Sequence, residues 1–242
     1  MSKTDRREIL SRVAAGTISP EEAASQLDAV THDEKETEPA IRRVRVIKQL
    51  GPAEIIGDPS IREAVAEGQH RARIDGDTMI IEGQMVEDWG GFIFGTPHSG
   101  GRDRLVVRVN PSLSLDLELQ AGNCRVSGVD GPIRADVQAG SATIEGFSKT
   151  LDLSVQAGSV RATGRLDEGD SRIACDAGSV NLHLERGSSV RVTTRVNMGK
   201  VSLPVGVAFA GGRGAQDVTI GDGVASLTID TNMGSVNLTA DQ

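Results

Sequence analysis

The chain has 242 residues, of which 38% are hydrophobic and 25% are charged, a composition typical of one large or two small globular domains. Its 26 Lys and Arg against 34 Asp and Glu give a net charge of −8, which repels phosphate backbones, so we expect no nucleic acid partner. Only 2% of the residues are aromatic, which argues against stacked recognition of nucleotides or sugars.

The amino-terminal sequence MSKTDRREIL is charged and lacks an apolar signal region, and no apolar run approaches the length of about 18 residues that a membrane helix needs. We therefore expect a cytoplasmic protein that reaches a membrane only indirectly, through a partner. Cys124 and Cys175 are too few for a disulfide framework, and no Cys/His spacing suggests zinc. Neither a metal nor a cofactor is predicted.

Residues 1–30 predict a helical hairpin. Ser19 to Glu22, in the sequence SPEE, form a capping box that starts the second helix. The apolar stripe of the hairpin consists of Ile9, Leu10, Val13 and Leu27. Because so short a hairpin cannot stand alone, we expect this stripe to dock on a partner. Residues 31–41 follow as an acidic, flexible linker.

A glycine-flanked segment concentrates the rare aromatic side chains. Trp89, Phe92, Ile93 and Phe94 lie within six positions of one another. Two interpretations stay open, a hydrophobic plug at the edge of the fold and an exposed contact loop.

From Leu115 onward the sequence repeats. The segments LQAGNCRV, VQAGSATI, VQAGSVRA, CDAGSVNL, VNMGKVSL and TNMGSVNL share one glycine, at Gly122, Gly140, Gly158, Gly178, Gly199 and Gly234. A weaker copy, QLGPAEIIG, places Gly51 in the same role. The spacing from Gly199 to Gly234 is about two periods, which predicts a degenerate copy between them.

Apolar and polar residues alternate on both sides of this glycine, which is typical of strands. Each copy is therefore a strand, a glycine corner and a second strand, and stacking successive copies buries their apolar faces. We predict a mainly β fold: a single-stranded, right-handed β-solenoid of about ten coils over residues 42–240, with the helical hairpin in front. We expect a positive φ at the corner glycines, with the preceding Ala or Met pointing inward.

The positions of the charged residues indicate which face of the strands points outward. Six positions before the glycine, successive copies carry Asp116, Arg134, Asp152 and Arg172, which predicts a charge ladder between neighbouring coils. Arg42, Arg43, Arg45 and Lys48 form a basic strip that we interpret as a solvated strand face.

No catalytic residues are predicted, because no histidine has a nucleophile partner at a recognisable spacing. Paired acids from Glu118, Asp136 and Asp152 would suit a polysaccharide-cleaving solenoid, but the surface ladder explains them better. Cys124 and Cys175 occupy inward positions and are interpreted as small core residues. We therefore expect a protein that is not an enzyme.

The repeated AGSV coils, the QLGPAEIIG opening and the DGDTMIIEG turn resemble the bacterial putative-adhesin family of β-strand-repeat proteins. The helical hairpin resembles the short, SHOCT-like domain found in front of many of them. The resemblance implies a β-solenoid without known catalytic residues, and a link to envelope-stress regulation.

Together these observations predict a non-enzymatic scaffold or protein-interaction module that binds a protein partner or itself. A polymer-forming, bactofilin-like cytoskeletal scaffold is the first alternative. A surface adhesin or a polysaccharide-acting β-helix enzyme is the second.

Overall fold

The computed structural model describes residues 40–84, 104–204, 209–210 and 215–241. The chain divides into two units, Met1–Ala40 and Ile41–Gln242, and almost all described residues belong to the second. Every regular element among them is a strand, which confirms the mainly β class. The helical hairpin predicted over residues 1–30 lies outside the described residues.

The strands fall on the alternating segments of the sequence, because side chains that alternate between apolar and polar can bury one face of an extended chain. They are β1 (Arg43–Lys48), β2 (Pro52–Gly57), β3 (Ala64–Glu67), β4 (His70–Asp75), β5 (Thr78–Gly83), β6 (Leu105–Val109), β7 (Ser114–Ser127), β8 (Ile133–Phe147), β9 (Leu151–Val155), β10 (Ser159–Gly164), β11 (Asp170–Cys175), β12 (Ser179–Leu184), β13 (Val190–Val196), β14 (Lys200–Ser202), β15 (Phe209–Ala210), β16 (Ala215–Ile220), β17 (Ala225–Thr231) and β18 (Ser235–Ala240).

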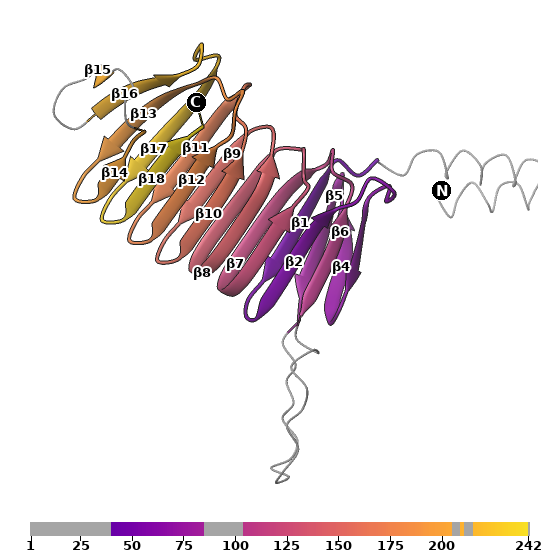
Figure 1. The fold of residues 1–242 in the computed structure, drawn as a ribbon. Coiled ribbons are helices and arrows are strands. Elements are labelled where there is room, and N and C mark those ends of the chain that lie inside the picture. The colour runs from indigo at the N-terminus through magenta and orange to yellow at the C-terminus, as the bar shows by residue number, and fades with distance from the viewer. Residues whose placement is uncertain (1–39, 85–103, 205–208, 211–214, 242) are drawn as a thin grey trace, which may run out of the picture. The chain divides into compact units, whose positions relative to one another are not determined.

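These strands form two parallel ladders, one on each side of the glycine corner (Figure 1). The first ladder runs β5–β1–β7–β8–β9–β11–β17–β13. The second runs β6–β2–β7–β8–β10–β12–β18–β14. Strands β7 and β8 continue through the corner and belong to both ladders, so that one 18-stranded sheet results.

Eight repeats can be followed through both ladders, in the order β5–β6, β1–β2, β7, β8, β9–β10, β11–β12, β17–β18 and β13–β14. The prediction of about ten coils, stacked successively, is therefore wrong for the described residues. The order along the stack differs from the order in the sequence at both ends. At one end β5–β6 lies outside β1–β2, and at the other β13–β14 lies outside β17–β18, so β1–β2 and β17–β18 each occupy the second place from an end. Because all copies share one register, backbone hydrogen bonding permits either order.

Antiparallel strands finish both ends of the stack. Strand β4 pairs with β5 and β3 pairs with β6 at one end, while β16 pairs with β13 and β15 with β16 at the other. Residues 215–220 thus form an antiparallel strand where the sequence suggested a degenerate coil. The 35-residue spacing between Gly199 and Gly234 reflects this excursion.

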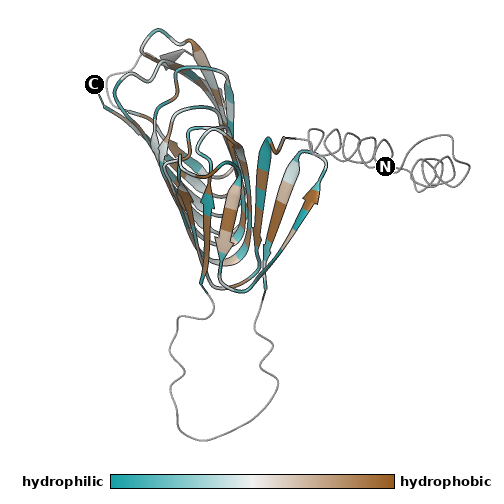
Figure 2. Cartoon of the chain, turned by 90° about the vertical axis from the view of Figure 1, so that its right-hand side faces the viewer, coloured by the Kyte–Doolittle hydropathy of each residue, from teal (hydrophilic) through white to brown (hydrophobic). Residues whose placement is uncertain are grey.

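The core lies between the two layers of strands, which Figure 2 shows from the β4 end. The inward assignment is confirmed: the residues two and four positions after the glycine are buried, as with Val180 and Leu182 at 1% exposure, or packed partly buried against the core, as with Val201 and Leu203. Leu117, Ala135, Leu153, Ile173 and Ile229, five positions before it, are equally buried. One continuous apolar cluster therefore runs the length of the stack.

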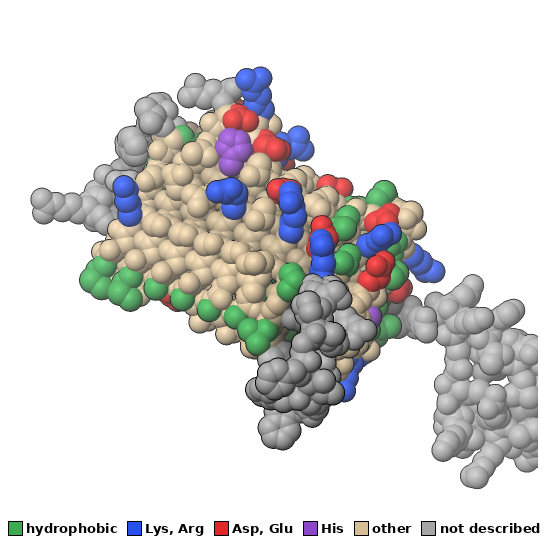
Figure 3. Space-filling view, turned by 60° about the horizontal axis from the view of Figure 1, so that its bottom comes forward, with side chains coloured by type: hydrophobic (Ala, Val, Ile, Leu, Met, Phe, Trp, Pro, Cys, Tyr) green, Lys and Arg blue, Asp and Glu red, His purple; other side chains and the backbone are tan. Residues whose placement is uncertain are grey.

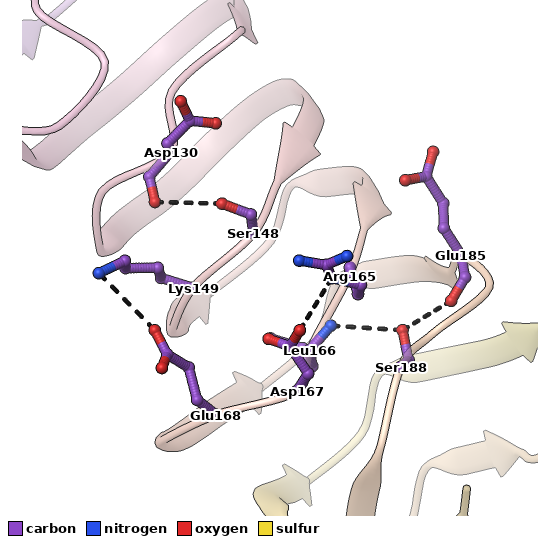
Figure 4. A network of polar contacts seen from close by, with 9 residues as sticks. All are labelled: Asp130, Ser148, Lys149, Arg165, Leu166, Asp167, Glu168, Glu185 and Ser188. Atoms are coloured by element: carbon purple, nitrogen blue, oxygen red, sulfur yellow. Dashed lines mark hydrogen bonds and ion pairs between the residues drawn. The ribbon is translucent and has the colours of Figure 1, made fainter.

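The turns that connect successive repeats, opposite the glycine corner, are tied by polar contacts (Figure 4). Ser148 Oγ donates to the carbonyl oxygen of Asp130 at 3.3 Å, and Lys149 pairs with Glu168 at 3.6 Å. The backbone N–H of Leu166 donates to Ser188 Oγ at 3.3 Å. These contacts link turns that are about 20 residues apart in sequence, so this edge is polar and charged.

Within the described part of the chain, no helix has the length and apolar character needed to cross a bilayer.

Replacing Val180 by Asp tests the inward assignment. Val180 is 1% exposed, so a carboxylate there is buried without a partner, and we expect a loss of about 3–5 kcal/mol in the free energy of unfolding. The neighbouring exposed Asn181→Asp should change it by less than about 0.5 kcal/mol. Urea titration followed by circular dichroism measures both, and equal losses would contradict the assignment.

Candidate interaction surface

The outer face of the first ladder carries the predicted charge rows, and neighbouring repeats neutralise one another. Asp116, Arg134, Asp152 and Arg172 lie side by side in register, which confirms the ladder. Arg134 pairs with Asp152 at 3.9 Å and Asp116 with Arg43 at 3.7 Å. These side chains are partly exposed, so each pair contributes about 0–1 kcal/mol and serves register more than stability.

The candidate acid pair is part of this arrangement. Glu118 lies opposite Asp136 in the ladder, but Glu118 accepts a hydrogen bond from Arg45 Nη2 at 2.9 Å. Asp152 is paired with Arg134 as above. The Oδ1 atom of Asp136 is buried and has no hydrogen-bond partner among the described residues. Glu118 and Asp136 therefore lie side by side in the row four residues before the glycine, and Asp152 lies in the row six residues before it, all on the outer face of the ladder.

Lys48 was predicted to belong to a solvated basic strip, but the structure places its side chain in the interior. It is only 2% exposed, in contrast to Arg43 and Arg45. Its position in β1 faces the core, and a Cβ on Gly83 would lie 2.8 Å from Lys48 Cδ. The missing side chain of Gly83 thus makes room for the lysine stem.

The predicted corner glycines stack directly on one another across seven repeats. Gly51, Gly122, Gly140, Gly158, Gly178, Gly234 and Gly199 follow one another in this order. A Cβ on any of the last six would lie within 3.0 Å of the carbonyl oxygen of the glycine before it. At Gly158, for example, the distance to the oxygen of Gly140 would be 2.6 Å.

The expected reason for these glycines was wrong at most positions. Only Gly51 and Gly122 have a positive φ, 87° and 139°. At the other five corners, the close approach of the neighbouring backbone excludes a side chain. Glycine is required here by packing between repeats, because the backbones of neighbouring repeats approach each other more closely at the corner than a Cβ allows.

The residue before each glycine also differs from its prediction, because it points outward. Met198 and Met233 are 72% and 59% exposed, and Leu50 is 45% exposed. In stack order, this apolar row consists of Leu50, Ala121, Ala139, Ala157, Ala177, Met233 and Met198. Repeats are about 4.8 Å apart, so six steps make a row about 29 Å long.

Two rows of mostly uncharged polar residues flank the apolar row. On the first-ladder side are Gln49, Gln120, Gln138, Gln156, Asp176, Asn232 and Asn197. On the second-ladder side are Pro52, Asn123, Ser141, Ser159, Ser179, Ser235 and Lys200. We call these rows, with the apolar and glycine rows between them, the corner ridge.

The corner ridge is poor in charge although 25% of the chain is charged. Asp176 and Lys200 are its charged side chains. Polar groups within it bond to each other: Ser141 Oγ donates to Asn123 Oδ1 at 2.6 Å, and Asn197 Nδ2 to Asn232 Oδ1 at 3.0 Å. Figure 3 shows hydrophobic side chains following one edge of the molecule beside a surface of few charges.

A shallow groove borders the ridge near the carboxyl-terminal repeats. It is lined by Arg172, Ala174, Asp176, Arg195, Asp230 and Asn232, among others. Asp230 lies between the two arginines, 2.8 Å from Arg172 Nη2 and 3.6 Å from Arg195 Nη1. Ala174, whose side chain is shorter than those of its register partners Ser154 and Asp230, is one of the lining residues.

The other predicted contact residues lie outside the described residues. They are Trp89, Phe92, Ile93 and Phe94 of the aromatic segment and Ile9, Leu10, Val13 and Leu27 of the helical hairpin. Among the residues that are described, no group of three or more His, Cys, Asp and Glu could hold a metal ion. Sequence alternation did not reveal the ridge, because the residues five and three positions before the glycine are inward and the same period places the residue directly before it inward as well.

Both cysteines are buried in the core, Cys124 at 4% and Cys175 at 1% exposure. Burial raises the pKa of Cys124 to about 12 and also raises the pKa of Cys175. A thiol that stays protonated is a poor nucleophile. This agrees with their interpretation as core residues.

No protein-family model matches the sequence, and no curated protein matches it. Two solved structures are similar to it. One, described as a "putative cell adhesion protein" from Clostridium sporogenes, is 11% identical with a TM-score of 0.45 and aligns over 84% of this chain and 94% of its own. The other, a "putative adhesin" from Bacteroides fragilis, is 10% identical with a TM-score of 0.31 and aligns over 82% and 92%.

Gly158→Ala tests the packing at the corner. Its Cβ would lie 2.6 Å from the Gly140 oxygen and 2.8 Å from Val137 Cγ1, so neighbouring repeats must separate, at a cost of about 1–3 kcal/mol in the free energy of unfolding. Ala157→Ser, on the exposed neighbour, is the matched control and should be silent. Chemical denaturation measures both; an alanine as well tolerated as the serine would remove the packing explanation.

Thiol accessibility tests the burial of the cysteines. Because the pKa of Cys124 is about 12, we expect almost no reaction of the native protein with a disulfide reagent such as DTNB between pH 7 and 9. Both thiols should react promptly in guanidinium chloride. Rapid native labelling would show that the core opens.

Proposed function

We propose that the described unit is a β-solenoid scaffold that acts through protein contacts and not through catalysis, with the corner ridge as its contact surface. The observation that carries the proposal is the exposed row that ends in Met233 and Met198. It lies in the corner ridge, to which seven successive repeats contribute two charged side chains, Asp176 and Lys200.

Protein interfaces have the same character at their centres. Their cores are depleted of charged residues and enriched in methionine and aromatic residues. Methionine adapts to the shape of a partner because its side chain is flexible and polarisable. The ridge is also rigid, because the backbone of its inner repeats is hydrogen-bonded to the repeats on both sides. A preorganised surface loses little conformational entropy on binding.

The charged outer face of the first ladder supports the non-catalytic part of the proposal. A general acid or base must be positioned toward a substrate with a pKa suited to its task. Glu118 and Asp152 instead bond to arginines of adjacent repeats. Their arrangement therefore serves to keep neighbouring repeats in register.

The ends of the stack favour a discrete scaffold over the bactofilin-like polymer. Continued coil-on-coil growth needs parallel strand edges, whereas β4 and β16 are antiparallel to their neighbours. Strand β4 also carries exposed charge at Arg71 and Arg73, a common protection of edge strands. The hairpin and aromatic contacts, the cytoplasmic location and the role in envelope-stress regulation stay predictions.

Met233→Glu and Ala157→Glu test the ridge, because a charge at its centre must be desolvated in any complex. We expect both variants to keep the native circular dichroism and melting temperature while weakening association at least tenfold. Association is measured by sedimentation equilibrium for self-association and by affinity purification from the native host for a partner.

Ile74→Glu is the matched control, because Ile74 is 62% exposed on β4, away from the ridge. It should retain whatever the unmodified chain binds. Retention of every contact by both ridge variants would contradict the ridge as the binding surface. Salt-resistant filaments that survive them would favour the polymer, and polysaccharide turnover lost with Glu118→Gln would favour the enzyme.

A further inference from the structure

The repeat β17–β18 is inserted between two repeats that precede it in the sequence (Figure 1). Strand β17 pairs in parallel with β11 on one side and with β13 on the other. Strand β18 pairs likewise with β12 and β14. The space between β11–β12 and β13–β14 is therefore a slot that is one repeat wide, and we call it the insertion slot.

One short crossover connects the inserted repeat to the preceding strand, β16. Residues 221–224 pass over the start of β13, where the N–H groups of Asp222 and Val224 donate to Ser189 Oγ at 3.1 and 3.2 Å. Gly221 and Gly223 have φ values of 61° and 69°, which glycine adopts without strain. All other contacts of the repeat with the slot are noncovalent.

The slot recognises its insert by charge, hydrogen bonds and shape. Asp230 lies between Arg172 of β11 and Arg195 of β13, and Asn232 accepts from Asn197. A Cβ on Gly234 would lie 2.5 Å from Cys175 Sγ, so the insert needs a glycine at its corner. The slot thus selects a strand–glycine–strand segment with an acid four residues before the glycine.

The segment that meets these requirements is present on every copy of the chain. Either copy's β17–β18 would make the same contacts with a given slot, and only the crossover would differ. Exchange of an identical element between two chains therefore has a small free-energy difference and depends on protein concentration.

We propose that the insertion slot accepts β17–β18 from a second copy of this chain, so that two copies join by reciprocal exchange of this repeat. The proposal rests on the topology and on the contacts of the slot, and is independent of the function proposed for the corner ridge. The partner is the chain itself, and the interface is the native slot.

A charge-reversal experiment tests the exchange in the full-length protein. One variant carries Asp230→Arg, and a second, differently tagged, carries Arg172→Asp and Arg195→Asp. Alone, each places like charges in its own slot, so we expect a lower melting temperature. Unfolded together and refolded at high concentration, they should form a mixed dimer of twice the 25.4 kDa chain mass, with a melting temperature restored toward that of the unmodified protein.

The matched control reverses a pair that no exchange of β17–β18 can affect. Arg125 Nη2 and Glu145 Oε2 are 2.8 Å apart on β7 and β8, so Arg125→Glu and Glu145→Arg should refold together as two monomers. If the slot variants also give only monomers, each with its own lowered melting temperature, the proposal is wrong.

A second measurement covers variants that fail to fold. Two differently tagged samples of the unmodified chain, refolded together at high concentration, should yield a dimer that carries both tags. Light scattering and sequential affinity purification detect it. Absence of a doubly tagged species at every concentration tested would overturn the exchange.

Discussion

The close approach of backbones at the glycine corner is the constraint on which the structure depends. Parallel strands hold their neighbours at about 4.8 Å, and here both strands of a repeat must keep that spacing while the chain turns between them. A Cβ at Gly158 or Gly178 would collide with the carbonyl oxygen of the preceding glycine. Glycine at this place therefore fixes the register of both ladders at once.

A fixed register turns the chain into columns, and the character of each column follows from its distance to the glycine. Columns two and four residues away on the second ladder are apolar and form the core. The column six residues before the glycine alternates in charge, as with Arg134 beside Asp152. The column directly before it is exposed, since the turn directs that side chain away from both layers.

The sequence predicted the apolar and the charged columns well, because period-two alternation indicates which face of a strand is buried. The sequence could not predict the stacking order where two copies of the repeat fit the same place in the stack equally well. The corners at Gly199 and Gly234 share the sequence Asn-Met-Gly, so periodicity could not tell which repeat lies next to Gly178. Lys48 was misplaced because its burial depends on the space left by Gly83, a residue of a distant strand. The outward methionines were missed because apolar character was equated with burial.

The first and last repeats in the sequence, β1–β2 and β17–β18, each lie between two other repeats, and this determines how the unit would respond to force. In an ordinary stack, tension applied at the first and last strands peels the outermost repeat from a single neighbour, one hydrogen bond after another. Here β1–β2 and β17–β18 each have a ladder on both sides. Their removal must break two sets of backbone hydrogen bonds together, so the first and last repeats in the sequence are held as firmly as the repeats in the middle of the stack.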